Sequence, residues 1–330
     1  MSSILNIGVI GLGVMGQRML ERIRSHPRLN ACLVWDEQPD AIARTLQIDP
    51  RLRPSHSAQE LIASPGLHGL YIATPPAAHL ALSHLAFDAG LAVLCEKPLT
   101  VDFEAAQIAI QRIERESLRA AVNFSLASSP ALTLLQQRFG NAAHDGLSSL
   151  KAVQIELGFA AWPRPWQSAA GAWLSERAEG GFTREVLSHF IFALQRVLGP
   201  ASVLKSEAEF PPKGEGAETA LHARLRAGGV DISVDARVDA EIAVPDRNCM
   251  RWLTSDGEIE LREWFSQARQ RQGQGQDWQT LGDAADLRAT GQLSQLDQWV
   301  HLIEDRPHGL PGYAEALAVQ QTIEALLSRD

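Results

Sequence analysis

The chain has 330 residues, of which 45% are hydrophobic and 21% charged, with a formal net charge of -9. A single hydrophobic core stops growing near roughly 250 to 300 residues, so we expect two domains. The acidic balance and the lack of a basic stripe argue against a nucleic-acid partner. No apolar run reaches the ~18 residues of a membrane helix. We therefore expect a soluble protein that acts on a small molecule.

The amino terminus and the cysteines indicate a cytoplasmic protein. The first ten residues, M-S-S-I-L-N-I-G-V-I, lack the basic region and the cleavage site of a secretory signal. Cys32, Cys95 and Cys249 are widely spaced and form no C-x-x-C pair. This spacing favours neither a disulfide framework nor a metal site, so we expect no metal.

The first third of the chain alternates short apolar runs with helical patterns. Pro39 opens one helix, and Ser57 with Glu60 forms a capping box before another. Alternation of this kind predicts a doubly wound parallel sheet with right-handed crossovers. The expected strands are 4–10, 31–35, 67–74, 91–95 and 119–124, and the other expected helices are 14–25, 77–89 and 102–117.

After about residue 124 the pattern changes to longer runs with partial alternation. The expected strands are 147–159, 202–210, 217–225, 229–238 and 248–262, the expected helices are 130–139, 183–198, 291–304 and 313–328, and 266–278 is expected to be an exposed loop. The predicted fold class is therefore α/β, with an N-terminal Rossmann domain at 1–123 and a C-terminal α+β domain at 124–330 built on a mostly antiparallel open sheet. The last helix could pack back on the first domain. Because the second sheet has an outer face to cover, we expect a homodimer or homotetramer.

A glycine-rich turn follows the first strand and opens the first helix. Gly11, Gly13 and Gly16 form G-x-G-x-x-G, with Val14 and Met15 at the start of the helix. In this context the first glycine permits the turn, the second lets the backbone approach a pyrophosphate, and the third allows close helix packing. These five residues are candidates for cofactor binding. The alternative is a tight strand-to-helix turn that binds nothing.

An acidic residue ends the second strand, where a dinucleotide ribose would lie. Asp36 follows Gly16 by 20 residues, and Glu37 rather than an arginine stands next to it. A carboxylate there accepts hydrogen bonds from ribose hydroxyls and repels a 2'-phosphate, which favours NAD over NADP. The alternative is a strand-end acid that only contacts solvent.

Two further segments resemble a known family. Residues 73–79 (A-T-P-P-A-A-H) and 95–98 (C-E-K-P) are similar to two signatures of the glucose-fructose oxidoreductase and inositol dehydrogenase (Gfo/Idh/MocA) family. The resemblance covers essentially the whole chain and is weakest over 200–290. It implies a cofactor site in which four residues border the nicotinamide ribose, namely Thr74, Pro75, His79 and Glu96. Asn123 is a further candidate for cofactor binding.

The same resemblance gives Lys97 a place beside both the nicotinamide and the reacting oxygen, with a cis bond to Pro98. Independently of the family, Lys97 ends a parallel strand, at the sheet edge where such sheets bind ligands. The alternative is an ordinary loop charge.

The second domain contains the segment G-G-F-T-R-E-V-L-S-H-F-I-F at 180–192. Glu185 and His189 are four residues apart and so share one helix face. The family pattern that this segment resembles usually has an Asp three residues after the histidine, where this chain has Phe192. A histidine titrates near neutral pH and is a common general acid or base. The alternative is a core histidine flanked by aromatic residues.

Substrate contacts are expected from an aromatic segment. The loop at 123–130 lacks the arginines that many relatives have before the proline, which puts anionic or phosphorylated sugars in doubt. Trp162, Arg164 and Trp166 are replacement candidates, together with Arg184. The aromatic segment is equally consistent with a packed loop or an oligomer contact.

These features predict an NAD(H)-dependent oxidoreductase that acts on a hydroxyl or keto carbon of a small polyhydroxylated substrate. Lys97 would polarise the substrate oxygen, His189 would take or return its proton, and Glu185 would orient the histidine or bind a neighbouring hydroxyl. All three are expected to converge between the domains. Two alternatives are an NAD-dependent glycoside hydrolase of the same fold and a non-catalytic NAD(H)-binding sensor.

Overall fold

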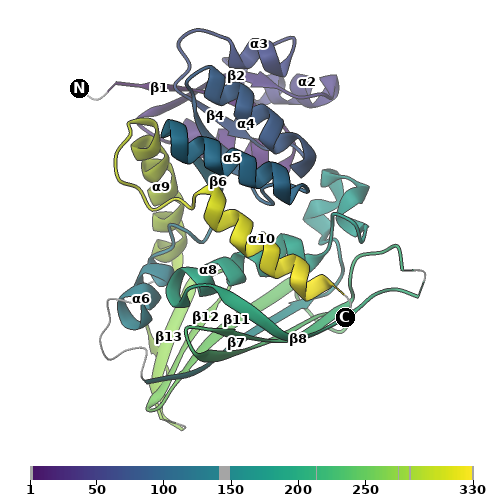
Figure 1. The fold of residues 1–330 in the computed structure, drawn as a ribbon, viewed down its shortest axis with the longest axis vertical. Coiled ribbons are helices and arrows are strands. Elements are labelled where there is room, and N and C mark those ends of the chain that lie inside the picture. The colour runs from purple at the N-terminus through teal and green to yellow at the C-terminus, as the bar shows by residue number, and fades with distance from the viewer. Residues whose placement is uncertain (1–2, 141–148, 213, 274, 282–283, 329–330) are drawn as a thin grey trace. The chain divides into compact units, whose positions relative to one another are not determined.

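The computed structural model describes residues 3–140, 149–212, 214–273, 275–281 and 284–328 (Figure 1). The chain divides into two compact units. The N-terminal unit comprises Met1–Phe124 and Gln292–Leu317, and the C-terminal unit comprises Ser125–Gly291 and Ala318–Asp330. The long helices α9 (Ala284–Ile303) and α10 (Tyr313–Leu327) each contribute residues to both units. None of the helices within the described residues is long and apolar enough to cross a membrane.

The N-terminal unit contains a six-stranded sheet in which every pair is parallel. Its order, β3-β2-β1-β4-β5-β6, is typical of a Rossmann fold. This confirms the predicted doubly wound parallel sheet. The strands are β1 (Leu5–Ile10), β2 (Leu29–Trp35), β3 (Arg53–Pro54), β4 (Gly69–Ile72), β5 (Ala92–Glu96) and β6 (Ala120–Asn123).

The helices of this sheet begin where the sequence predicts. Pro39 is the first residue of α2, Ser57 Oγ accepts a hydrogen bond from the Glu60 amide, and Asp102 caps α5 through the Ala105 amide. The bounds are α1 (Val14–Arg24), α2 (Pro39–Ile48), α3 (Ala58–Ile62), α4 (His79–Asp88) after a 3-10 turn, η1 (Pro76–Ala78), and α5 (Phe103–Glu116).

A distant segment completes the core of the N-terminal unit. Leu296, Trp299 and Val300 of α9 pack in one apolar cluster with Ile7 and Tyr71 of the sheet. The Tyr71 and Trp299 ring centroids are 6.1 Å apart. Burial of side chains of this size stabilises a fold by roughly 1.5 to 3 kcal/mol each. The N-terminal sheet is therefore held partly by residues about 175 positions beyond its last strand, which ends at Asn123.

The C-terminal unit contains an eight-stranded sheet of order β14-β13-β12-β11-β7-β10-β9-β8, which is antiparallel except for the parallel pair β7 and β10. This confirms the mostly antiparallel prediction. Its strands are β7 (Leu150–Phe159), β8 (Ala201–Glu209), β9 (Ala220–Ala227), β10 (Val230–Val238), β11 (Asp246–Thr254), β12 (Gly257–Arg262), β13 (Gln267–Gln272) and β14 (Gln279–Thr280).

Two predictions for this sheet need correction. The run expected at 248–262 is two strands, β11 and β12, joined by a turn at residues 255–256. The segment 266–278, expected to be an exposed loop, contains β13, which pairs with β12 along its whole length. Residues 147 and 148 of the strand expected at 147–159, and residue 274 of the loop expected at 266–278, lie outside the described residues.

The two faces of this sheet differ. Alternate residues of β9 and β10 are buried, on the side where α8 (Ser188–Leu198) packs and where α6 (Pro130–Phe139) packs on α8 (Figure 1). Most of the exposed residues between them are charged or titratable, and some pair across the strands, such as Arg226 with Asp231 and His222 with Asp235. Because charged groups tolerate solvent, this face needs no apolar cover. The homo-oligomer stays a prediction, and the need to cover this face no longer supports it.

Candidate functional site

The strand ends of the N-terminal sheet place the predicted cofactor residues in one row. Ile10 is level with Trp35 and with Ile72, Ile72 is level with Cys95, and Glu96 is level with Asn123. The residues that follow these positions leave the sheet together at its carboxyl edge, where open parallel sheets bind ligands. Glycines, carboxylates and Lys97, all distant in sequence, therefore lie along one edge.

The three glycines have different surroundings. Gly11 has φ +91°, and a Cβ there would lie 2.4 Å from the Ala73 carbonyl oxygen. A Cβ at Gly16 would lie 2.0 Å from the Gly11 carbonyl oxygen. In contrast, a Cβ at Gly13 would meet nothing within 4 Å. The first and third glycines are thus required by the turn itself, while the second borders open space at the start of α1.

That open space suits an anion. Gly13 is the N-cap of α1, and the first turn of the helix, which includes Val14 and Met15, carries no acidic residue. The first backbone N–H groups of a helix lack intrahelical partners and lie at the positive end of its dipole. A pyrophosphate can therefore bind there without a competing charge.

Asp36 ties the end of β2 to the glycine-rich turn. Its Oδ2 accepts a hydrogen bond from the Leu12 amide at 2.6 Å, and its Oδ1 accepts one from the Gln38 amide at 2.8 Å. An ionised carboxylate has about four lone-pair sites, so both oxygens can accept further bonds from ribose hydroxyls. Asp36 is therefore more than a solvent-facing acid, because it also orders the turn.

The loops after β4 and β5 are joined by a buried histidine. The His79 ring is fully buried, with Nδ1 2.9 Å from the Pro98 carbonyl oxygen and Nε2 2.8 Å from the Thr74 carbonyl oxygen. Burial lowers the pKa of His79 below its usual value. His79 is thus positioned to hold the two loops, and any effect on a cofactor must pass through Thr74 and Pro98.

These loops keep groups available at the edge. The Lys97–Pro98 bond is cis, as expected. Pro75 is exposed and Lys97 is partly exposed. The Thr74 hydroxyl oxygen is buried and has no hydrogen-bond partner within the described residues. An unsatisfied buried hydroxyl costs about 1 to 3 kcal/mol, which a hydroxyl of a bound dinucleotide would offset. Together with the open space at Gly13, this shows that the residues present fit a dinucleotide.

A buried polar network lies directly beneath Lys97. Glu96 and Asn123 are only 5% and 3% exposed, and the Glu96 Oε1 accepts bonds from the Tyr71 hydroxyl and, at 2.6 Å, from Asn123 Nδ2. Gln295 Nε2 donates to Asn123 Oδ1. Burial, together with the nearby Glu96 carboxylate, raises the pKa of Tyr71 well above its usual range. Glu96 and Asn123 therefore support the loop that carries Lys97 from inside the fold.

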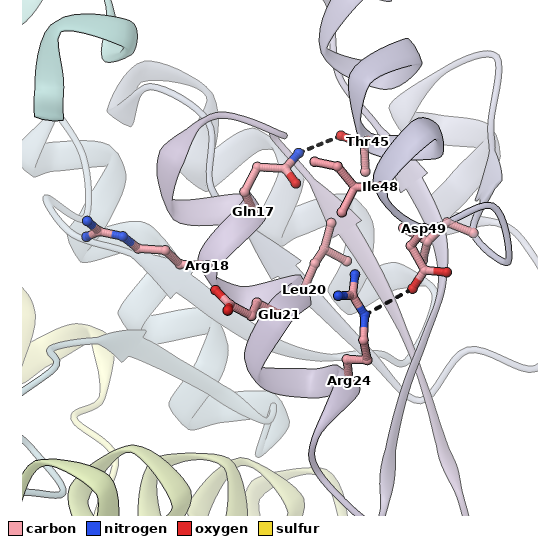
Figure 2. Close-up of a pocket in the computed structure, with 9 residues that line it drawn as sticks. Gln17, Arg18, Leu20, Glu21, Arg24, Thr45, Ile48 and Asp49 are labelled. Carbon is pink, nitrogen blue, oxygen red and sulfur yellow. Dashed lines mark hydrogen bonds and ion pairs between the residues drawn. The ribbon is translucent and has the colours of Figure 1, made fainter.

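A separate pocket lies between α1 and α2 (Figure 2). Four of its polar side chains already form pairs, since Gln17 Nε2 donates to Thr45 Oγ1 at 2.5 Å and Arg24 contacts Asp49 at 3.4 Å. None of the three motif glycines lines it. This pocket is therefore not the predicted dinucleotide site.

In the C-terminal unit, the helix that carries His189 begins irregularly. Residues Thr183–Leu187 form a π-helical turn (η4), and α8 starts at Ser188, so the regular helix predicted from 183 is corrected. Single π turns are frequent at functional sites. The buried Glu218 carboxylate accepts the Thr183 amide at 2.6 Å, a capping contact that the sequence did not reveal. Glu185 is partly exposed.

The His189 imidazole is 7% exposed and stands at 79° to the Trp264 ring, with centroids 5.7 Å apart. Phe190 and Phe192, which flank it in sequence, are fully buried. The Phe192 ring, at the position where the family usually has an Asp, lies 4.9 Å from the Arg196 guanidinium carbon. His189 is therefore a buried histidine whose ring contacts a tryptophan, Trp264, that the sequence analysis did not single out.

Both arginines predicted to contact substrate are engaged elsewhere. Arg164 is 4% exposed, pairs with Asp246 at 2.6 Å and also donates to Gln167. Arg184 makes two bonds to the Glu324 carboxylate, at 2.6 and 2.7 Å, and its remaining nitrogen donates to two backbone carbonyls. These partners neutralise both guanidinium charges. The role of Arg184 as a substrate contact stays a prediction, and its donors are used within the fold.

The two predicted tryptophans have different surroundings. The Trp162 indole N–H donates to the Leu174 carbonyl at 2.9 Å, and its ring packs on Phe159 and Phe182. Trp166 is 41% exposed, and its ring centroid lies 4.7 Å from the Arg164 guanidinium carbon. Trp162 is thus partly exposed but held by aromatic rings, and Trp166 remains accessible.

No cluster of three metal-ligating side chains occurs in the part of the chain that the structure describes.

Comparisons with known proteins agree with the dinucleotide site. Residues 5–124 match the model of an oxidoreductase family with an NAD-binding Rossmann fold, GFO_IDH_MocA. Inositol 2-dehydrogenase of Corynebacterium glutamicum is 33% identical over 111 residues, which cover 32% of each chain. UDP-N-acetylglucosamine 3-dehydrogenase of Acidithiobacillus ferrooxidans is 29% identical over 133 residues, or 40% of this chain and 41% of that protein. In both relatives, the match spans less than half of the protein's length.

The fold match extends further than the sequence match. A crystal structure of an oxidoreductase from Agrobacterium radiobacter, in complex with NAD+, L-tartaric acid and magnesium, superposes with a TM-score of 0.80 at 14% identity. It covers 98% of this chain and 95% of that one. Identity this low shows a shared fold only. Residues 5–124, most of the N-terminal unit, therefore match the NAD-binding Rossmann domain of the Gfo/Idh/MocA oxidoreductase family.

Proposed function

We propose that this protein is an NAD-dependent dehydrogenase or reductase that acts on a hydroxyl or keto carbon of a small, uncharged polyhydroxylated molecule, such as a sugar or a cyclitol. The observation that carries the proposal is the edge of the N-terminal sheet. It combines an open anion site at Gly13, the Asp36 carboxylate and Lys97 above a buried polar network. The two relatives named above are dehydrogenases of an inositol and of a nucleotide-linked sugar.

NAD supplies the hydride acceptor or donor when it is bound. The residues of this chain would handle the oxygen and its proton. In this proposal Lys97 donates a hydrogen bond to the substrate oxygen and stabilises its developing negative charge, and His189 takes or returns the hydroxyl proton. Glu185 orients the imidazole or binds a neighbouring hydroxyl.

The proposal of an uncharged substrate follows from the two arginines of the C-terminal unit. The Asp246 carboxylate neutralises Arg164, and Glu324 neutralises Arg184. A phosphate or carboxylate on the substrate would have to compete with these short, charge-assisted bonds. A neutral polyol needs only hydrogen bonds and an apolar surface.

The test is a turnover screen of the purified protein with NAD+ or NADH, following the absorbance of NADH. The panel contains myo-inositol, D-glucose and D-xylose, with D-glucose 6-phosphate as the charged counterpart of glucose. We expect turnover of at least one neutral compound, with NAD preferred to NADP. We also expect glucose 6-phosphate to react more slowly than glucose.

Two results would contradict the proposal. Tight NADH binding without turnover of any polyol would favour a sensor. Cleavage of a glycoside without net consumption of NAD+ would favour the glycoside hydrolase. Asp36→Ala is the matched control for cofactor choice, because it should weaken NAD+ binding and relax the discrimination against NADP+.

A further inference from the structure

The loop between β12 and β13 has an unusual backbone. Glu263, Trp264 and Phe265 have φ values of 49°, 58° and 61°, so three consecutive residues other than glycine occupy the left-handed region. The left-handed helical conformation costs roughly 1 to 2 kcal/mol for each such residue. Strain of this size persists only where the surroundings hold it, and it tends to occur at functional sites.

Specific contacts hold this loop. The Trp264 amide donates to Asn248 Oδ1 at 2.7 Å, and the Ser266 hydroxyl donates to the Glu263 carbonyl, also at 2.7 Å. Phe265 is 1% exposed and packs edge-on against Phe190 at 5.6 Å. The loop is therefore anchored on the first turn of α8, beside the predicted general acid or base.

Trp264 is the loop residue that reaches His189. The indole and imidazole planes meet at 79°, and the ring centroids are 5.7 Å apart. Unlike Phe265, Trp264 is partly exposed. The partly exposed indole of Trp264 therefore stands nearly perpendicular to the His189 imidazole.

The Arg164 guanidinium carbon lies 5.5 Å from the Trp264 ring centroid, and Asp246 balances the charge of Arg164. This cation–π contact adds a further restraint on the ring. A ring held by its backbone, by a cation and by Phe190 loses little entropy when a ligand packs on it. A pre-organised surface of this kind contributes more to affinity than a mobile side chain does.

We infer that Trp264 is a substrate-specificity residue, which selects ring-closed polyols by packing against the C–H face of the ring while a hydroxyl of that ring approaches His189. The inference rests on the proposed function and deepens it. A cyclic sugar or cyclitol presents a rigid, partly apolar face that matches an aromatic plane. An acyclic polyol has no such face and would have to be ordered on binding.

The experiment measures both binding and turnover in the full-length protein loaded with NAD+. Binding is followed by saturation-transfer difference NMR, which reports the ligand protons that lie against the protein. The probes are myo-inositol, D-glucose and D-xylose as rings, and D-sorbitol as the acyclic polyol. The variants are Trp264→Ala, Trp264→Phe and Asn248→Ala.

Trp278→Ala is the matched control, because the Trp278 ring packs on Arg269 and Arg271 of the same sheet. We expect Trp264→Ala to raise KM or Kd for a ring-closed probe by roughly tenfold, the equivalent of one ring-stacking contact. Trp264→Phe should recover part of this loss, and Trp278→Ala should match the wild type. kcat and the Kd of NADH should change by less than about threefold, which a general loss of structure would not allow.

The outcomes separate this inference from the proposed function. If a cyclic probe binds in a Trp264-dependent way but is never turned over, the dehydrogenase proposal fails and this inference holds. If a polyol is turned over with equal KM by the wild type and Trp264→Ala, the inference fails and the dehydrogenase stands. Equal losses for sorbitol and for the cyclic probes would also overturn it. The inference would also be overturned if none of the cyclic probes bound.

Discussion

The two units differ in what they do with charge. At the carboxyl edge of the N-terminal sheet, the space beside Gly13 is open, and the Thr74 hydroxyl has no partner among the described residues. In the C-terminal unit, both arginines near the aromatic segment already have carboxylate partners. The open space and the available hydroxyl of the first unit thus suit a charged dinucleotide. The second presents rings and a histidine, which suit a neutral ligand.

The sheet type explains part of this difference. Parallel strands end at a common edge, so the register of the sheet alone brings together side chains that follow different strands. In the antiparallel sheet, successive side chains alternate between the two faces, and its exposed charges pair across strands, as Arg251 does with Glu156. Its chemistry then depends on single loops such as the one that carries Trp264.

The largest expected effect tests whether both units contribute to chemistry. We expect Lys97→Met and His189→Ala each to lower kcat/KM by roughly 10²- to 10⁴-fold, the usual effect of removing a positioned acid or base. If both groups act on the same oxygen, the double variant should lose much less than the product of the single losses. Steady-state kinetics with the best substrate from the screen measures both quantities.

The control for this pair is His222→Ala, because His222 is an exposed histidine of the same unit that pairs with Asp235. Its activity should equal that of the wild type. The affinity for NADH should fall far less in His189→Ala than in Gly13 or Asp36 variants. If His189→Ala retained full activity, His189 would be a core histidine, and the C-terminal unit would serve only recognition.

A smaller effect separates folding from binding within the N-terminal unit. A Cβ at Gly16 would overlap the Gly11 carbonyl oxygen, whereas one at Gly13 meets no atom, and the φ of Gly13 is -69°. Gly16→Ala should therefore destabilise the protein by about 1 to 3 kcal/mol, as overpacking does. Gly13→Ala should leave stability within about 1 kcal/mol of the wild type, because alanine accepts this conformation.

The two measurements are thermal unfolding and NADH titration. Gly13→Ala should melt like the wild type but bind NADH at least about tenfold more weakly, since its methyl group would occupy the approach to the pyrophosphate. Unchanged NADH affinity in Gly13→Ala would show that the phosphates lie elsewhere. A stable Gly16→Ala would show that the turn can shift.

The fold of the N-terminal unit could be predicted well because its signals are local. Strand, glycine turn, helix caps and prolines are short patterns with fixed geometry. The exception is β3, only two residues long and including Pro54, which has no hydrophobic pattern to detect. In the C-terminal unit, β13 is rich in Gln and Arg, and pairs between distant residues, such as Arg271 with Glu258, help to hold it. A sequence pattern does not show such partners.

The site shows the same limit. The spacing of the glycine motif identified the glycines and Asp36, whereas the family resemblance and the end of a predicted strand identified Lys97. The register of the parallel sheet brings these residues to one edge. Arg184 has its partner Glu324 140 residues away, so its neutralisation was invisible in the sequence. Trp264 also escaped notice, because its left-handed loop contains no glycine to mark the turn. The local signal in the sequence is the pair Trp264 and Phe265, which follows the run expected at 248–262.

The smallest expected effect concerns an ion pair that holds the returning segment of the N-terminal unit. Arg28, just before β2, donates to both carboxylate oxygens of Glu304, just after α9, and Arg306 donates as well. The hydrogen bonds from Arg28, followed by those from Arg306, lower the pKa of Glu304 from 4.5 to about 2. A lowered carboxyl pKa stabilises the fold above the unfolded value of 4.5, and this contribution disappears as the pH falls to about 2.

Glu304→Gln should therefore lower the Tm at neutral pH by a small amount, on the order of 2 °C. The carboxylate is partly exposed, and solvent screens such pairs. As the pH falls towards 2, wild-type Glu304 becomes protonated and the two melting curves should converge.

Glu207→Gln is the matched control in the other unit, because Glu207 pairs with Lys205 on the exposed face of β8, where both side chains are more than half exposed. It should change the Tm less than Glu304→Gln at every pH. A Glu304→Gln protein that melts like the wild type at neutral pH would show that the apolar contacts of α9 alone hold this segment on the N-terminal sheet.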